Sequence, residues 1–133
     1  MSSLQIEHRN PSALHHNPAF THVVTVRGAD ALVFVGGQNA VDAAGNIVGE
    51  TLSTQAEQAL RNVLAALAFV NATQEQVVRL GIYLVQGQDA SEAFAAARRI
   101  WGVHPTTITV LSVVALANPR FLVEIEATAA IAA

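Results

Sequence analysis

The chain has 133 residues, of which 52% are hydrophobic and 13% charged, and its formal net charge at pH 7 is −3. This length predicts one domain over residues 1–133 with one hydrophobic core. All seven basic residues are arginines and no cysteine occurs, which excludes thiolate chemistry, cysteine-ligated zinc and catalytic or P-loop lysines. No cofactor is therefore expected, and the acidic balance argues against a nucleic-acid partner.

The apolar content predicts a protein that associates with copies of itself. So few charged side chains cannot cover the apolar surface of a monomer. The longest apolar runs, Val63 to Val70 and Val113 to Ala117, are shorter than the ~18 to 20 residues of a membrane helix, so no membrane partner is expected. Residues 1–10 lack a basic leader and an apolar segment, so we expect a cytoplasmic location.

The first third of the chain predicts strands separated by turns. A short strand is expected from Leu4 to His8, and two prolines with paired histidines predict a loop from Asn10 to Pro18. Apolar and polar residues alternate from Phe20 to Arg27. The turn Gly28-Ala29-Asp30 then leads into the apolar run Leu32 to Val35, which predicts a hairpin of these two strands.

Two helices and a strand are expected in the middle of the chain. Thr54-Gln55-Ala56-Glu57 has the capping-box pattern and predicts a helix from Thr54 to Asn71. Alternation from Val77 to Val85 predicts a strand with Arg79 on one of its faces. Asp89 is the expected start of a second helix, and Gly102 is its expected end.

The last third predicts two strands, Thr107 to Ala115 and Phe121 to Ala130, that pair antiparallel or lie close together. From Val110 onward the first of them is apolar on both faces, so both faces must be covered. Two helices can cover only one face of such a sheet. We therefore expect a partner subunit on the other face, with ligand sites at the subunit interfaces.

Three segments match motifs of a known family. They are Phe34-Val35-Gly36-Gly37-Gln38, Pro105-Thr106-Thr107-Ile108-Thr109-Val110 and Glu124-Ile125-Glu126-Ala127. On these segments the chain resembles the Rid family (reactive intermediate deaminases, also called YjgF), where they read Phe-Val-Ser-Gly-Gln, Pro-Ala-Arg-Ser-x-Val and Glu-Ile-Glu-Ala. The resemblance implies an α+β, chorismate-mutase-like fold, with a mixed six-stranded sheet and two helices on one face, assembled as a homotrimer.

The resemblance also implies a candidate site. In the family, the arginine clamps the carboxylate of an imine derived from an amino acid, and the glutamate positions the water that hydrolyses it. Glu124 matches that glutamate, whereas Phe20 replaces a tyrosine and Gly36 a serine of many members. The predicted catalytic residue is Glu124, and the predicted substrate-binding residues are Phe20, Gly36, Gly37, Thr107 and Thr109.

Thr107 stands where the family has its arginine. A guanidinium offers a charged fork of donors, whereas threonine offers one neutral hydroxyl. Losing two charge-assisted hydrogen bonds of roughly 1.5 to 3 kcal/mol each costs on the order of a thousandfold in affinity. Arg120 lies about 13 Å from Glu124 along the strand, so only a neighbouring subunit's Arg120 or Arg27 is considered as a replacement.

Each candidate has a simpler interpretation. Alternating glutamates are typical of a solvated strand face, and threonines are good strand residues whose hydroxyls often bond only to backbone. Gly36-Gly37 favours a bulge or close backbone approach over phosphate binding. His15, His16 and His22 indicate a surface loop, and no metal site is predicted.

The sequence leaves three functions open. The first is a Rid protein that binds or hydrolyses an uncharged or cationic small molecule, with Glu124 ordering water. The second is a non-catalytic metabolite-binding or interaction trimer. The third, an endoribonuclease or translation inhibitor, is disfavoured by the acidic charge and the lack of a basic stripe.

Overall fold

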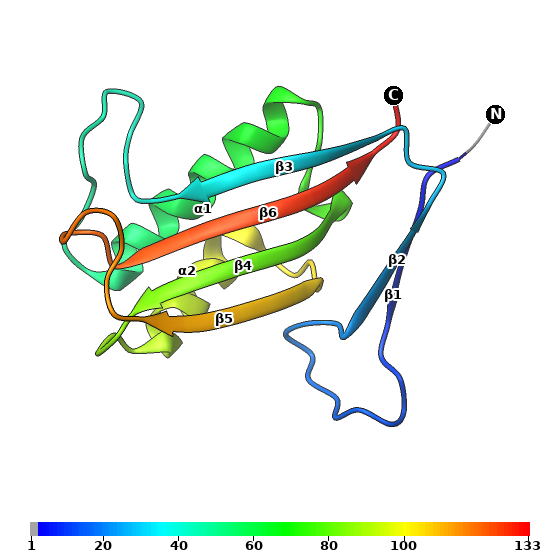
Figure 1. Ribbon diagram of the computed structural model, residues 1–133, viewed down its shortest axis with the longest axis horizontal. Coiled ribbons are helices and arrows are strands. Elements are labelled where there is room, and N and C mark those ends of the chain that lie inside the picture. Colours follow the sequence, from blue (N-terminus) through cyan, green and yellow to red (C-terminus); the bar gives the residue numbers. More distant parts are fainter. Residues whose placement is uncertain (1–2) are drawn as a thin grey trace.

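The computed structural model describes residues 3–133, which form an α+β fold (Figure 1). Its elements are β1 (Gln5–Arg9), β2 (Val23–Arg27), β3 (Ala31–Gln38), α1 (Leu52–Phe69), a 3₁₀ turn (Gln74–Gln76), β4 (Val77–Val85), α2 (Ala90–Trp101), β5 (Thr107–Val113) and β6 (Val123–Ile131). Four strands form a mixed sheet in the order β3-β6-β4-β5, in which only β4 and β5 run parallel. Both helices cover the same face of this sheet.

The six predicted strands are present, but they form two sheets rather than one. β1 and β2 pair with each other in a separate arm that projects from the domain (Figure 1). The predicted hairpin of β2 and β3 is therefore wrong, because β3 pairs with β6 instead. Alternation identified β2 as a strand, yet it carries no information on the partner.

Of the two arrangements predicted for β5 and β6, direct antiparallel pairing is wrong. β4 lies between them and pairs parallel with β5 and antiparallel with β6. The α2 crossover explains this order, because a parallel pair needs a long connection, usually a helix, between its strands.

The central strand β6 divides the sheet into two faces. Val123, Ile125, Ala127 and Ala129 are each at most 3% exposed and point to the helices. The residues between them, Glu124, Glu126 and Thr128, are half-buried on the face that no helix covers. Period-two alternation therefore places every polar side chain of this segment on that open face.

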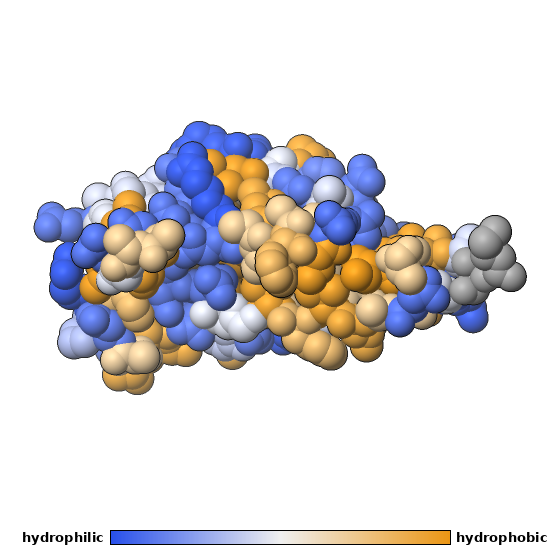
Figure 2. All heavy atoms as spheres, turned by 90° about the horizontal axis from the view of Figure 1, so that it is seen from above, coloured by the Kyte–Doolittle hydropathy of each residue, from blue (hydrophilic) through white to orange (hydrophobic). Residues whose placement is uncertain are grey.

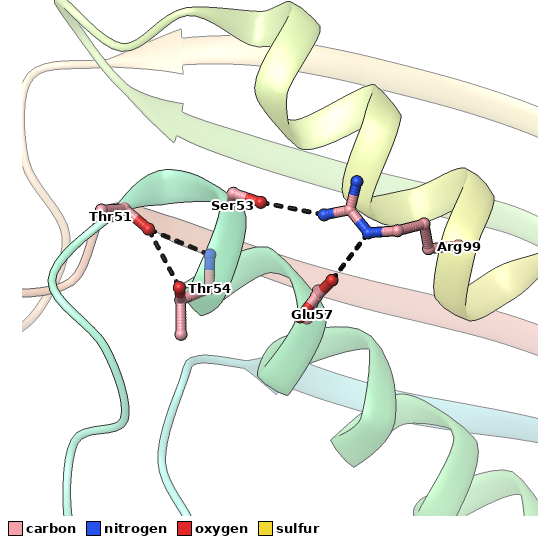
Figure 3. Close-up of polar contacts among 5 residues, drawn as sticks. All are labelled: Thr51, Ser53, Thr54, Glu57 and Arg99. Carbon is pink, nitrogen blue, oxygen red and sulfur yellow. Dashed lines mark hydrogen bonds and ion pairs between the residues drawn. The ribbon is translucent and has the colours of Figure 1, made fainter.

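Helix α1 begins at Leu52, two residues before the predicted start at Thr54. The cap is Thr51, whose Oγ1 accepts a hydrogen bond from the Thr54 backbone N–H at 3.2 Å (Figure 3). Glu57 has another role: its Oε1 accepts from Nε of Arg99 on α2 at 2.9 Å, and Arg99 also donates to Ser53. These bonds tie the two helices together at the surface.

The predicted ends of α2 are confirmed. Asp89 caps its start by accepting hydrogen bonds from the hydroxyl and the backbone N–H of Ser91, which hold the pKa of this carboxyl below its ordinary value. Gly102 ends the helix with a φ of +79°, a conformation that favours glycine. In residues 3–133, neither helix combines the length and the apolar character that crossing a membrane requires.

Gln55 joins helix α1 to two loops. Its side chain is 1% exposed, and its amide nitrogen donates to the carbonyls of Gly49 at 3.1 Å and Arg120 at 2.9 Å. Its amide oxygen accepts from the Leu122 backbone N–H at 2.9 Å. One buried amide thus satisfies three backbone groups beside the start of β6.

We expect Gln55→Leu to lower the free energy of unfolding by about 3 kcal/mol, because it leaves these three backbone groups without partners. Urea denaturation measures the change. The matched control is Gln58→Leu on the same helix, whose amide donates only to Asn62 and whose loss should cost about 1 kcal/mol or less. Equal losses in both variants would contradict the assigned role of Gln55.

Candidate functional site

The candidate site lies on the open face of the sheet, where the strand register arranges side chains in rows. Thr109, Gly81 and Glu126 form one row across β5, β4 and β6. The next row holds Leu111, Tyr83 and Glu124. The middle residue of the first row is Gly81, which has no side chain. Neighbouring side chains can therefore occupy the space over β4 at this position.

Glu124 is held against a bulge in β3. Gly36 and Gly37 lie opposite the single residue Glu126 of β6, which confirms the bulge that the paired glycines predict. A Cβ on Gly37 would overlap Oε2 of Glu124, so a side chain at this position would displace the carboxylate. The other oxygen, Oε1, accepts a hydrogen bond from Nδ2 of Asn39 at 3.2 Å.

Asn39 is fixed in turn by helix α1. Its Nδ2 also donates to the Val123 carbonyl at 3.1 Å. Nδ2 of Asn62 donates to the carbonyls of Asn39 and Val41 at 3.0 and 2.8 Å, and Oδ1 of Asn62 accepts from Gln58. The network therefore runs from the helix side of the sheet to the Glu124 carboxylate on the open face and orients it.

Glu126 lies over Gly81 and is bound from both sides. Its Oε1 accepts from the Tyr83 hydroxyl at 2.7 Å and from Nη1 of Arg79 at 3.3 Å. A Cβ on Gly81 would lie 2.8 Å from the same oxygen, so this glycine makes room for the carboxylate. Arg79 thus brings a guanidinium to the open face, and its charge is offset by Glu126.

The hydroxyl of Thr107 is hydrogen-bonded to the backbone. Its Oγ1 donates to the Val78 carbonyl at 2.6 Å, as the simpler interpretation of this residue expects. It lies in register with Arg79, two rows from Glu124, which is about 13 Å along the strands. Thr109 is exposed in the row of Glu126.

Phe20 lies apart from Glu124 in this chain. It lines a cavity on the helix side of the sheet and stacks edge-on with His15 and His22 at centroid distances of 6.0 and 5.3 Å. A ring nitrogen of His22 also bonds to the His15 carbonyl at 2.7 Å. These two histidines therefore pack the loop after β1.

Sequence reasoning missed two residues of this face. Arg79 lies on β4, the strand paired with Thr107, whereas the replacement arginines predicted from the sequence were Arg120 and Arg27 of a neighbouring subunit. Its alternation with Gly81 and Tyr83 was the available signal. Asn39 follows β3 without any motif, so nothing in the sequence linked it to Glu124.

Comparisons with known proteins agree with this fold and these motifs. The model of the endoribonuclease L-PSP family matches residues 11–131. The Rid-family protein YyfB of Yersinia pestis is 32% identical, with 95% of this chain and 98% of that chain covered and a TM-score of 0.84. The chain therefore belongs to the endoribonuclease L-PSP family, that of the Rid and YjgF proteins.

More distant relatives share the same architecture. Rv2704 of Mycobacterium tuberculosis, from the YjgF/YER057c/UK114 family, is 28% identical over 96% of this chain and 100% of that chain, with a TM-score of 0.65. Yeast Mmf1, 20% identical over 96% and 99% of the two chains, shows the same fold at a TM-score of 0.71. No curated protein matches the chain in sequence.

We expect Gly37→Ala to displace the Glu124 side chain and to lower the free energy of unfolding by about 1 kcal/mol, since the bond from Asn39 is lost. Gly36→Ala is the matched control. No atom lies within 4 Å of a Cβ at that position, so its effect should stay below about 0.5 kcal/mol. Urea denaturation of both variants tests this, and indistinguishable curves would contradict the packing described.

Tyr83 is the single tyrosine of the chain, so its titration can be followed alone. The hydrogen bond to Glu126, followed by burial and the negative charge of Glu126, raises the pKa of Tyr83 above its ordinary value of 10.0. The neutral phenol therefore stabilises the fold below the unfolded pKa, and this contribution is lost as the pH rises through the folded pKa.

Alkaline difference absorbance should give a tyrosinate midpoint above that of the urea-unfolded chain. Glu126→Gln should lower this midpoint, because it removes the negative charge beside the phenol. Glu92→Gln, an exposed position on α2, removes an equal charge and should leave it unchanged. A Glu126→Gln midpoint equal to that of the wild type would contradict the assigned contact.

Proposed function

We propose that the open face carries a small-molecule site for an uncharged or cationic metabolite, formed between copies of the chain in a homotrimer, and that standard 2-imino acid deamination is not its activity. The observation that carries this proposal is the fixed Glu124 carboxylate on a face where the guanidinium of Arg79 is already paired with Glu126. Glu124 and Glu126 contribute two negative charges and Arg79 one positive charge among the described groups of this site. That balance favours a neutral or cationic ligand over a carboxylate.

Arg79 supports this proposal rather than replacing the family's arginine. To clamp an anion, it would have to leave Glu126, whose carboxylate would then face both the anion and Glu124. Its side chain is 46% exposed, so water also screens its charge. Thr107 adds no cation and has already donated its hydroxyl hydrogen to Val78.

Apolar side chains on the same face favour contact with further copies of the chain. Leu32, Phe34 and Leu111 are 58%, 75% and 48% exposed. Figure 2 looks onto the β3 edge from above and shows apolar atoms gathered over its middle and toward the end where β3 begins.

Light scattering tests the trimer, for which a mass three times the 14.0-kDa chain is expected.

A catalytic and a non-catalytic form of this function differ in one step. If the protein is an enzyme, it is a hydrolase of the Rid type, in which Glu124 orders the attacking water by accepting a hydrogen bond from it. The non-catalytic form binds the metabolite and leaves it intact. Incubation with pooled uncharged and cationic metabolites separates the two, because only the first yields Glu124-dependent products.

The endoribonuclease activity named in the family's description is the less favoured alternative. A ribonuclease needs cations along the RNA phosphates, whereas this chain is acidic and its basic residues are scattered over the arm, both helices, the sheet and the loop before β6. Salt-sensitive binding of RNA at submicromolar concentration would favour it instead.

The cytoplasmic location stays a prediction.

We expect the wild-type protein not to accelerate hydrolysis of 2-iminopropionate generated by an amino acid oxidase, because Thr107 offers no guanidinium and Arg79 is paired with Glu126. Trapping of the imine with semicarbazide gives the rate. Clear acceleration by the wild type, abolished in Glu124→Ala, would overturn the proposal.

Thr107→Arg should raise this activity if the remaining cleft still supports the chemistry, since it restores the charged donor at the family's position. Thr107→Gln is the matched control, which adds length and donors without charge. An equal gain of activity in the two variants would contradict a role for charge at position 107, whereas no gain in either would implicate Phe20 and Gly36 as further departures.

A further inference from the structure

An ion pair on the open face joins Arg79 of β4 to Glu126 of β6. Nη1 of Arg79 lies 3.3 Å from Oε1 of Glu126, and the two side chains are 46% and 35% exposed. Exposed ion pairs usually contribute little, because holding two long side chains in one geometry costs conformational entropy. A pair that controls ligand binding therefore needs at least one partner that other contacts hold in place.

Glu126 is such a partner. Its Oε1 also accepts a hydrogen bond from the Tyr83 hydroxyl at 2.7 Å. Gly81 lies directly beneath this side chain, since a Cβ at that position would lie 2.8 Å from Oε1 and 2.9 Å from Cγ of Glu126. The bond to Glu126 raises the pKa of Tyr83 above its ordinary value of 10.0, so the phenol stays a donor at neutral pH. These contacts fix the carboxylate independently of Arg79.

Glu124 is held by a different strand. Its carboxylate packs over Gly37 of β3 and accepts a hydrogen bond from Asn39 at 3.2 Å. It forms no ion pair within the described part of the chain. The two glutamates therefore lean over opposite neighbours of β6, and Arg79 bonds to Glu126 alone. The charge of Glu126 is compensated, whereas that of Glu124 is not.

We propose that Glu126 and Tyr83 determine the charge preference of the open-face site by holding Arg79 away from the ligand. This inference rests on the proposed function of that face. While Arg79 is paired, the uncompensated charge of Glu124 repels anions. Without the Glu126 carboxylate, the same guanidinium can turn its fork of donors to a carboxylate of the ligand. Rejection of anions is therefore a property of two side chains on adjacent strands.

Pyruvate and its neutral analogue pyruvamide test this proposal, because they differ in charge and hardly in size. Nuclear magnetic resonance titrations at constant ionic strength, followed through the backbone amides of Gly37 and Gly81, give the affinity for each probe. The wild type should bind pyruvate no more tightly than pyruvamide. Glu126→Gln should bind pyruvate about tenfold more tightly than the wild type does and leave the affinity for pyruvamide unchanged.

Glu124→Gln is the matched control, since it removes an equal charge from the same face and leaves Arg79 paired with Glu126. Its affinity for pyruvate should stay close to that of the wild type. The gain of Glu126→Gln should disappear in the double variant Arg79→Gln/Glu126→Gln, which has the net charge of the wild type. Tyr83→Phe should give a smaller gain, because Glu126 then loses one of its two partners, and it carries the test if Glu126→Gln does not fold.

Three outcomes would overturn this role of Glu126 and leave the proposed function in place. They are no gain for pyruvate in Glu126→Gln, a gain that persists in the double variant, and an equal gain in Glu124→Gln, which net charge alone would explain. A wild type that binds pyruvate more tightly than pyruvamide would overturn the proposed function as well, because the site would then accept an anion while Arg79 is paired.

Discussion

The pairing of β6 on both of its edges is the constraint on which the rest of the structure depends. A strand between two neighbours cannot slip by one residue without exchanging its faces. Ile125 and the other buried residues of β6 therefore face the helices, and Glu124 and Glu126 lie on the opposite face of the sheet. The candidate site and the cavity behind it are two outcomes of the same alternation.

Glycines opposite β6 show how the fold accommodates two carboxylates. Gly37 on β3 and Gly81 on β4 each lie where a Cβ would overlap a glutamate side chain. The glutamate side chains therefore pack over the neighbouring strands instead of extending into solvent. Glu124 gains a bond from Asn39, and Glu126 gains bonds from Tyr83 and Arg79.

The sequence allows the strands, the α2 boundaries and the bulge at Gly36-Gly37 to be predicted, because each depends on local periodicity or turn chemistry. Strand partners could not be predicted. The pairing of β2 with β1, and the position of β4 beside β5, depend on contacts between distant segments. The contacts of Arg79 and Asn39 with the glutamates could not be predicted for the same reason. Only the strand register and the loop after β3 bring these side chains together.

The arm of β1 and β2 has a further consequence for how the molecule opens. Its strands pair with each other, and a backbone bond from the Thr21 N–H to the Thr106 carbonyl links the loop before β2 to the domain. Most arm side chains are exposed or half-buried, so little apolar surface resists local separation. Amide hydrogens of β2 will exchange with solvent through opening of the arm, whereas those of β6 exchange only when the sheet itself comes apart.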